Sequence, residues 1–154
     1  MNKKQHTGFT LVEVLLVIAI IAILASIVII AINPAKQLAQ ARNTQRWSNV
    51  NTILNAIHQY AIDNKGAMPV GVATTTKEIC ANGAITSTCS GASLADLRVL
   101  TDNEIYFTAI PGDPTCPTGC NASGLGYTVK KSANGRIVVA APGAELGETI
   151  SVTR

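Results

Sequence analysis

The sequence contains few aromatic and few charged side chains. Of its 154 residues, 4 % are aromatic and 14 % are charged, although 47 % are hydrophobic. A soluble domain of this composition has a small core and a weakly charged surface. The formal net charge of +3 does not predict strong binding to nucleic acid or to anionic lipid.

Motifs that mark an enzyme are missing as well. The sequence contains no phosphate-binding glycine loop, no nucleophile elbow and no His-Glu-x-x-His zinc motif. Its two histidines, His6 and His58, stand in no pattern that indicates catalysis. We therefore expect a protein that is not an enzyme.

The sequence does contain an uninterrupted apolar segment near its N-terminus. From Val14 to Ile32 only Ser26 is polar, and as a helix this run spans roughly 28 Å, close to the thickness of a bilayer core. Glu13 stands at its start. A carboxylate at mid-bilayer costs about 2.5–3.5 kcal/mol, and no side chain of the run carries a charge. Glu13 therefore needs a partner from outside this segment.

The residues around Glu13 form a recognisable motif. A short basic leader with Lys3 and Lys4 is followed by Gly8 and then by Phe-Thr-Leu-x-Glu, in which the matching residues are Phe9, Thr10, Leu11 and Glu13. This N-terminus resembles the type IV pilin and pseudopilin family. The resemblance implies cleavage between Gly8 and Phe9 by a prepilin peptidase and N-methylation of the new Phe9 amine. It also implies polymerisation into a helical filament with the help of an assembly ATPase and an inner-membrane platform protein.

The chemistry of cleavage agrees with this resemblance. Cleavage creates an ammonium group at Phe9, four residues before Glu13. In a stack of subunits, the amine of one chain can neutralise Glu13 of its neighbour, and removal of one partner of such a desolvated pair costs about 3–5 kcal/mol. We expect one crossing of the inner membrane before assembly and an extracellular pilus on the cell surface afterwards.

An ordinary secretory signal is the main alternative for the N-terminus. It would use Lys3-Lys4 as its basic part and Ala39-Gln40-Ala41 as its cleavage site, so that the mature chain begins at Arg42. The apolar run exceeds the roughly 7–15 residues of such signals, and a disposable signal gains nothing from Glu13. A plain single-pass anchor fits the length but leaves Glu13 unexplained.

The expected fold is α+β, with a long N-terminal helix that continues past the membrane. Apolar residues recur at helical spacing on one face, namely Leu38, Val50, Ile53, Leu54, Ile57 and Ala61. Polar residues are expected on the other face, namely Arg42, Gln45, Arg46, Asn49, Gln59 and Asp63. Pro34 kinks or breaks the helix, and Asn64-Lys65-Gly66 ends it, with Gly66 suited to a left-handed cap. We expect a helix from about Phe9 to Asn64.

The C-terminal part predicts a small antiparallel sheet. Asn134-Gly135 lies between the β-type runs Tyr127–Lys131 and Arg136–Ala140, which indicates a hairpin. Thr149–Thr153 alternates and adds a third strand, and Ile105–Ile110 is expected to be a short strand or an extended segment. A sheet of this size needs a surface to pack on, and the apolar face of the helix provides one.

Between helix and sheet, the sequence predicts a long loop from Gly66 to Asn103. Within it, Ser93-Leu94-Ala95-Asp96 resembles a capping box, so we expect a short helix from Leu94 to about Leu100. The predicted organisation is a leader 1–8, a membrane and filament-core helix 9–33, an amphipathic helix 34–65, a variable disulfide-stapled loop 66–104 and a sheet 105–154.

The four cysteines lie beyond the apolar segment in two close pairs, Cys80 with Cys89 and Cys116 with Cys120. An even number of cysteines in an exported domain favours disulfides. We favour a bond within each close pair, while cross-pairing, free thiols and a zinc site stay open as alternatives.

The segment Pro111-Gly112-Asp113-Pro114 is similar to the Pro-x-Asp-Pro element of major pseudopilins and simple pilins. Some of those pseudopilins bind calcium through acidic residues near the C-terminus. Here Glu145 and Glu148 are available, with Asp113, but no ladder of acidic ligands occurs. We expect no metal or other cofactor, with calcium as the alternative.

The leading interpretation is a structural subunit of a type IV pilus-like filament, whose main partner is the chain itself. The alternatives are a pseudopilin of a type II secretion system and a minor pilin that binds DNA or a surface ligand. DNA binding would use Lys130, Lys131 and Arg136, but no row of aromatic side chains accompanies them. DNA is therefore the less favoured partner.

Overall fold

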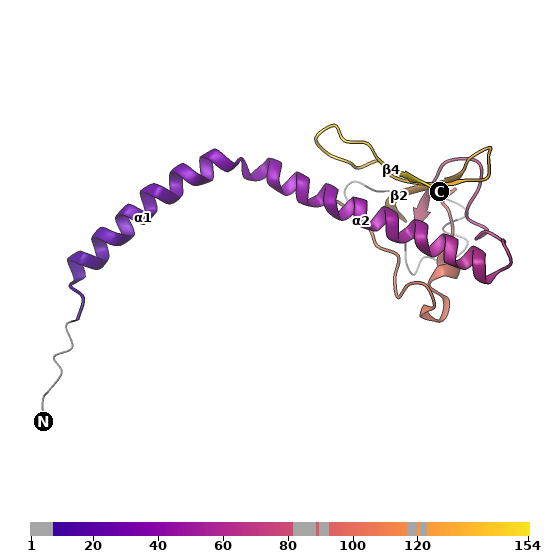
Figure 1. Cartoon of the computed structure of the whole chain (residues 1–154), viewed down its shortest axis with the longest axis horizontal. Coiled ribbons are helices and arrows are strands. Elements are labelled where there is room, and N and C mark those ends of the chain that lie inside the picture. Colours follow the sequence, from indigo (N-terminus) through magenta and orange to yellow (C-terminus); the bar gives the residue numbers. More distant parts are fainter. Residues whose placement is uncertain (1–7, 82–88, 90–92, 117–119, 121–122) are drawn as a thin grey trace, which may run out of the picture. The chain divides into compact units, whose positions relative to one another are not determined.

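The structure is a computed structural model that describes residues 8–81, 89, 93–116, 120 and 123–154. The chain consists of two compact units, Met1–Leu38 and Ala39–Arg154. We call the second unit the head. Figure 1 labels the main helices and strands.

The apolar segment forms α1 (Leu11–Ile32), a helix of 22 residues with a mean hydropathy of 3.5. Its length and composition are sufficient to cross a membrane, and none of its residues is buried by the rest of the chain. An exposed apolar surface of this size needs lipid or other protein to cover it. The predicted anchor is therefore present as a helix.

Asn33 separates α1 from α2 (Pro34–Asp63), so the predicted continuous helix is broken rather than kinked. Asn33 has a φ of 45° and a ψ of 79°, a left-handed conformation that asparagine tolerates. Its carbonyl oxygen accepts hydrogen bonds from the backbone N–H groups of Lys36 at 3.1 Å and Gln37 at 3.3 Å. Pro34 then occupies the first helical position, where its missing N–H costs no hydrogen bond.

The C-terminus of α2 lies where the sequence predicted it. The N–H of Gly66 donates to the carbonyl of Ala61 at 2.7 Å, the six-to-one bond of a Schellman motif. Gly66 has a φ of 89°, but Lys65 also adopts a left-handed conformation, with a φ of 55°. The termination therefore uses two successive residues, of which only the glycine was expected.

The sheet of the head has four antiparallel strands in the order β1-β2-β3-β4. They are β1 (Lys77–Cys80), β2 (Gly124–Lys131), β3 (Ile137–Ala141) and β4 (Ile150–Thr153). The predicted hairpin joins β2 to β3, with a bond from Ser132 N–H to the Arg136 carbonyl at 2.7 Å and a φ of 79° at Gly135. The predicted third strand of the C-terminal part is β4.

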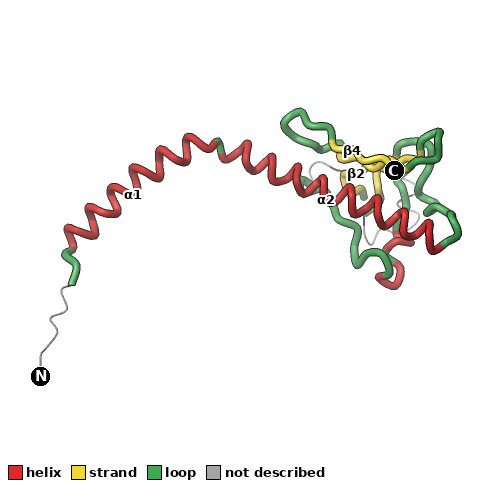
Figure 2. Tube along the Cα trace, viewed as in Figure 1, coloured by secondary structure: helices red, strands yellow, loops and turns green. Residues whose placement is uncertain are grey.

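The core of the head lies between α2 and the sheet. Val50, Ile53, Leu54 and Ile57 of α2 are fully buried, as the apolar spacing predicted. They share one cluster with the strand residues Leu125, Tyr127, Val129, Ile137, Val139, Ala141 and Ile150. Figure 2 shows α2 in red beside the yellow strands. The predicted α+β fold is confirmed.

The loop predicted between α2 and the sheet contains a strand that the sequence did not reveal. β1 pairs with β2 in the register Lys77↔Val129 and Glu78↔Thr128. The sheet was predicted to lie within residues 105–154. Its first strand, β1, lies earlier in the chain, at Lys77–Cys80. A strand of four residues depends on hydrogen bonds to a distant partner and leaves little periodicity of its own.

The short helix predicted from Leu94 to Leu100 is wrong. The N–H of Ala95 donates to the Glu78 carbonyl at 2.7 Å, and the Ala95 carbonyl accepts from Cys80 N–H at 2.9 Å. These bonds attach the segment to β1 and leave only a 3₁₀ turn, η1 (Arg98–Leu100), which is followed by η2 (Asp102–Glu104).

The segment Ile105–Ile110 was expected to be a short strand or an extended segment. It forms bends rather than a strand. The segment is instead attached to η1, because the N–H of Phe107 donates to the Leu100 carbonyl at 3.1 Å.

Candidate functional site

One candidate site is the N-terminus of α1. Gly8 and Phe9 precede the helix, and Phe9 is 82 % exposed. Thr10 is the N-cap, and its hydroxyl oxygen accepts a hydrogen bond from the backbone N–H of Glu13 at 3.2 Å. The structure thus places Gly8, Phe9 and Glu13 within the first turn of α1 and just before it.

Glu13 is the third residue of α1, where a carboxylate interacts favourably with the positive end of the helix dipole. Thr10-x-x-Glu13 is the pattern of a capping box. Both residues also belong to the family signature, and their spacing in the sequence is sufficient to indicate this local role. Among the described residues, no ion pair of the chain involves Glu13.

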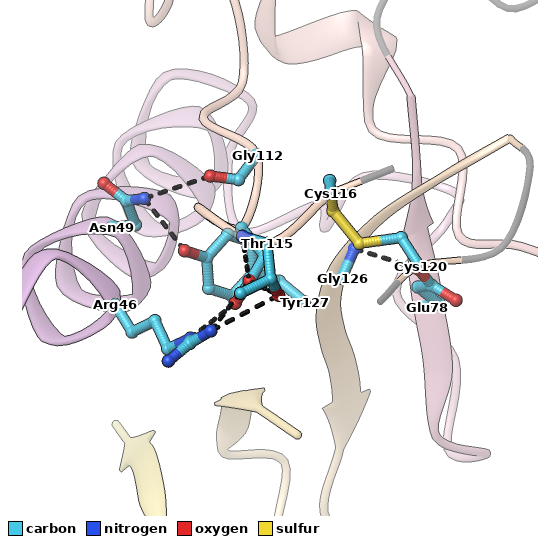
Figure 3. The surroundings of a disulfide bond; sticks show 10 residues. Arg46, Asn49, Glu78, Gly112, Thr115, Cys116, Cys120, Gly126 and Tyr127 are labelled. Atoms are coloured by element: carbon cyan, nitrogen blue, oxygen red, sulfur yellow. Dashed lines mark hydrogen bonds and ion pairs between the residues drawn. A yellow bond between two sulfur atoms is a disulfide. The ribbon is translucent and has the colours of Figure 1, made fainter. Parts of the chain in front are cut away.

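A separate polar cluster, within the head, contains a buried ion pair. Arg46 of α2 binds Asp113 through two hydrogen bonds, Nε to Oδ2 at 2.7 Å and Nη2 to Oδ1 at 3.0 Å. The side chains are 0 % and 2 % exposed. Figure 3 shows the guanidinium of Arg46 directed from α2 toward the segment that contains Thr115. Because the two ions have left water, each depends on the other for its charge balance.

Thr115 completes the surroundings of Asp113. Its backbone N–H donates to Oδ1 at 2.8 Å and its hydroxyl donates to the same oxygen at 2.6 Å. Burial alone raises the pKa of Asp113, but the hydrogen bonds from Arg46 and Thr115 outweigh it and lower the pKa below its ordinary value. Asp113 is therefore held in its ionised form.

Glu145, in the loop between β3 and β4, joins the same cluster. Its carboxylate accepts from Arg42 Nε at 2.7 Å and Nη2 at 2.6 Å, and from Arg46 Nη1 at 2.9 Å. The hydrogen bonds from Arg42 and then Arg46 lower the pKa of Glu145 to about 2. Two guanidinium groups of α2 thus hold one carboxylate of the loop.

Asn43 fixes the backbone of this loop. Its side-chain oxygen accepts from the Glu145 N–H at 3.0 Å, and its side-chain nitrogen donates to the Glu145 carbonyl at 2.8 Å and to Glu148 Oε2 at 3.1 Å. Asn43 is buried. We call Arg42, Asn43, Arg46, Asp113 and Glu145 the charged clamp, since together they attach two loops of the head to α2.

The charged clamp continues into the core through Asn49 and Tyr127. The side-chain nitrogen of Asn49 donates to the Tyr127 hydroxyl at 2.8 Å and to the Gly112 carbonyl at 3.4 Å. Tyr127 is fully buried in β2. The hydroxyl therefore has a partner inside the core, as a buried tyrosine requires.

The expectation that Arg46 lies on the polar face, opposite the apolar face of α2, is wrong, because Arg46 is fully buried. Arg46, Val50, Ile53 and Ile57 follow one another at spacings of four, three and four residues, so Arg46 continues the apolar face of α2. Its charge is tolerated there because Asp113 and Glu145 bind the guanidinium group. These two acids lie 67 and 99 residues after Arg46 in the sequence. The helical spacing of Arg46 can be read from the sequence, but its pairing with Asp113 and Glu145 cannot.

The cysteines form the two bonds that the sequence analysis favoured, Cys80–Cys89 and Cys116–Cys120. Within the described part of the chain, no cysteine is free. The Cys116–Cys120 disulfide lies close to Gly126 of β2 (Figure 3). The Gly126 N–H donates to Glu78 Oε1 at 2.8 Å, which ties β2 to β1 at this point.

The acids considered as calcium ligands each have a partner from α2. Asp113 and Glu145 bind guanidinium groups, and Glu148 accepts from Asn43. Among the described residues, no group of three or more acids, histidines or cysteines is arranged to hold a metal ion. The positive charge beside these carboxylates comes from Arg42 and Arg46.

Comparisons with known proteins give matches to part of the chain. Residues 3–31 match the prokaryotic N-terminal methylation motif. The type II secretion system core protein G of Aeromonas hydrophila is 38 % identical to the chain over 64 residues. These residues are 42 % of this chain and 43 % of that protein, so the chain spans less than half the length of this curated relative. No solved structure matches the chain significantly.

The methylation motif begins before the apolar helix and extends almost to its end. Together with the exposed helix, it indicates that the chain is anchored in a membrane through α1. The motif and the secretion-system relative confirm that this chain resembles the type IV pilin and pseudopilin family.

Proposed function

We propose that the chain is a structural, non-enzymatic subunit of a type IV pilus-like filament that assembles through α1. The single observation that carries this proposal is an apolar helix of 22 residues, none of them buried within the chain, with an acid in its first turn. Each valine, leucine or isoleucine side chain of that helix gains about 1.5–3 kcal/mol when it is fully removed from water. Lipid provides the cover before assembly, and the same helix of neighbouring copies provides it afterwards.

The maturation step of this proposal is cleavage between Gly8 and Phe9 by a prepilin peptidase, followed by methylation of the Phe9 amine. The motif match at residues 3–31 supports it. Both residues lie outside α1 and are exposed, so the bond is accessible to a peptidase at the end of the helix.

The assembly step pairs the Phe9 amine of one subunit with Glu13 of the next. The need of Glu13 for a counter-charge supports this pairing, because α1 contains no basic side chain. An unpaired acid in an apolar bundle is costly, so only the register that brings the amine to Glu13 is stable. Extraction from the bilayer requires work, for which we propose an assembly ATPase and a platform protein as partners.

Mass spectrometry of the N-terminus of the mature chain tests the proposal. A chain that begins with methylated Phe9 is expected. A mature chain that begins at Arg42 would instead establish an ordinary secretory signal and overturn the proposal.

A secretion pseudopilus is the second candidate function. It is favoured by the relative from Aeromonas hydrophila, whose name places it in a type II secretion system. Electron microscopy of cells labelled through the head distinguishes the two candidates. Long surface fibres that contain the chain are expected for a pilus, and their absence together with a secretion defect on deletion is expected for a pseudopilus.

A further inference from the structure

The loop between β3 and β4, residues 142–149, presents an exposed leucine in an unfavourable backbone conformation. The N–H of Glu148 donates to the Glu145 carbonyl at 3.2 Å, and between them Leu146 and Gly147 have φ angles of 59° and 73°. Turns with positive φ at both central residues favour asparagine, aspartate or glycine. Leu146 is 51 % exposed, so burial within its own chain compensates only in part for this strain.

This loop is also held firmly in place. The charged clamp binds the Glu145 side chain through Arg42 and Arg46, and Asn43 binds its backbone on both sides. A bulky apolar side chain is thus kept in solvent, in a strained turn, on a fixed support. Backbone strain that the surrounding structure holds in place is found often at functional sites, such as those that clamp a ligand.

A second surface of the head is hollowed. A hollow of about 300 Å³ lies between α2 and the segment Ile105–Phe107. We call it the α2 hollow, and it is lined by Thr52, Asn55, Ala56, Gln59, Ile105, Tyr106 and Phe107. Ile105 at its edge is 66 % exposed. The hollow therefore combines an uncharged floor with an apolar rim.

The charges beside the two surfaces are opposite. Glu148 lies next to the strained turn, and Arg154 donates from Nη1 to Asn55 Oδ1 at 2.6 Å beside the hollow. Both residues are exposed, and within the described residues neither forms an ion pair. An acid therefore lies beside the exposed leucine, and a base lies beside the hollow.

The two surfaces are different patches of one head. The loop is attached to α2 at Arg42 and Asn43, whereas the hollow includes Asn55, about 20 Å further along the helix axis. In Figure 1 the loop is the yellow segment that precedes β4. A contact between two different patches is heterologous, and when its rotation does not close, it produces an open filament.

We propose that Leu146 of one subunit inserts into the α2 hollow of the next subunit, with Glu148 facing Arg154 across the contact. This inference rests on the proposed filament function and adds a contact between heads to the contact between α1 helices. The charged clamp then acts as the support that presents Leu146 at a fixed position.

The direct test is photo-crosslinking from position 146 in the full chain. Leu146 is replaced by p-benzoylphenylalanine in cells, the fibres are irradiated and digested, and cross-linked peptides are identified by mass spectrometry. A bond to residues 52–59 or 105–107 of another copy is expected. If the fibres are normal but the crosslink from position 146 is to other residues, or if no crosslink to another copy forms, the proposed contact is wrong. Failure of the wild-type chain to form any fibre overturns the proposed function instead.

A substitution separates assembly from folding. Leu146→Asn suits the turn, so the head should melt at the same temperature as wild type or higher, while fibre yield falls roughly tenfold with the loss of an anchoring side chain. Val70→Asn is the matched control, because Val70 is fully exposed on the head and lies outside both surfaces. Equal fibre yields from both variants would overturn the proposal.

A charge exchange tests the second half of the contact. Glu148→Arg and Arg154→Glu should each lower the fibre yield, because each places like charges across the interface. The double variant restores opposite charges and should recover most of the yield. If the fibre yield of the double variant is no higher than that of the single variant with the lower yield, Glu148 and Arg154 do not face each other across the contact.

Discussion

Arg46 and Asp113 form a bidentate ion pair with almost no exposure to solvent, although 67 residues separate them in the sequence. The pair connects the middle of α2 to the loop that carries Pro111 and Pro114. Because a second acid, Glu145, binds the same guanidinium, one side chain attaches two loops of the head to the helix. The position of the loop that carries Leu146 therefore depends on a residue in the core.

Arg46→Leu should destabilise the head by about 3–5 kcal/mol, because it leaves Asp113 buried and charged without its partner. The measurement is the urea midpoint of the full chain in detergent, followed by the fluorescence of Trp47, the single tryptophan. Asp113→Asn, which retains the size of the side chain, should have a smaller effect.

The double variant Arg46→Leu with Asp113→Leu is the control for this interpretation. It removes both buried charges at once, so its loss of stability should be smaller than the sum of the two single leucine variants. Additive losses would mean that the two side chains stabilise the head independently and that the ion pair is not the relevant interaction.

The stability of the head should fall with acidification. The pKa of Glu145 is lowered from an ordinary 4.5 to about 2, because Arg42 and Arg46 bind the ionised carboxylate. A folded-state pKa below the unfolded value stabilises the fold above the unfolded pKa, and this contribution is lost as pH falls through the folded pKa. The pKa of Asp113 is also lowered, so its effect has the same sign.

Urea midpoints measured from neutral pH down to about pH 2 check this prediction. We expect a plateau above pH 4.5 and a steady decrease below it. Glu145→Gln cannot ionise, so its midpoint should be lower than wild type on the plateau and should approach wild type at the acid end. Parallel curves for the two proteins would show that Glu145 does not contribute to the pH dependence.

Gly126→Ala should destabilise the head by about 2–5 kcal/mol. Gly126 has a φ of 78°, and a Cβ atom there would lie 2.6 Å from Cys120 Sγ and 2.7 Å from Asp113 Cβ. Gly135→Ala is the matched control, since its φ is 79° but the nearest contact is Lys131 Cε at 3.9 Å. The difference between the two midpoints measures the crowding beside the disulfide, and equal midpoints would show that only backbone strain matters.

Much of this fold could be predicted because its signals are local. The apolar run defines α1, the spacing of Val50, Ile53 and Ile57 defines the buried face of α2, and Asn134-Gly135 defines the hairpin. Each of these patterns acts within a few residues, so the local sequence specifies the element.

The features that were missed depend on partners far away in the chain. β1 is held by hydrogen bonds to β2, and Ala95 joins β1 instead of continuing a helix after Ser93. Arg46 is buried only because Asp113 and Glu145 neutralise it. No local pattern announces such partners, so the charged clamp could not be found from the sequence.

Calcium should not affect the stability of the head. Arg42 and Arg46 supply the positive charge beside Asp113 and Glu145, so an added cation would meet carboxylates that are already paired. The Trp47 urea midpoint should be the same in excess calcium and in excess chelator. A clear increase of the midpoint with calcium would show that the acids bind the metal in spite of the arginines.

Glu13→Ala should abolish fibre assembly while the chain still enters the membrane. Removing the acid makes insertion of α1 easier, but it leaves the Phe9 amine of a neighbouring subunit without its partner in an apolar bundle, at a cost of about 3–5 kcal/mol. Membrane fractionation and the yield of sheared fibres measure the two effects separately.

Thr10→Val is the control for the local role of Glu13. It removes the hydroxyl that accepts from the Glu13 N–H but keeps the carboxylate, so it should cost about 0.5–2 kcal/mol in the first turn of α1. A modest loss of fibres is expected, well short of that in Glu13→Ala. If the two variants lose fibres equally, Glu13 acts mainly by capping its own helix. If Glu13→Ala forms normal fibres, the pairing of Glu13 with a neighbouring Phe9 amine is wrong, and the register of the filament must be set elsewhere.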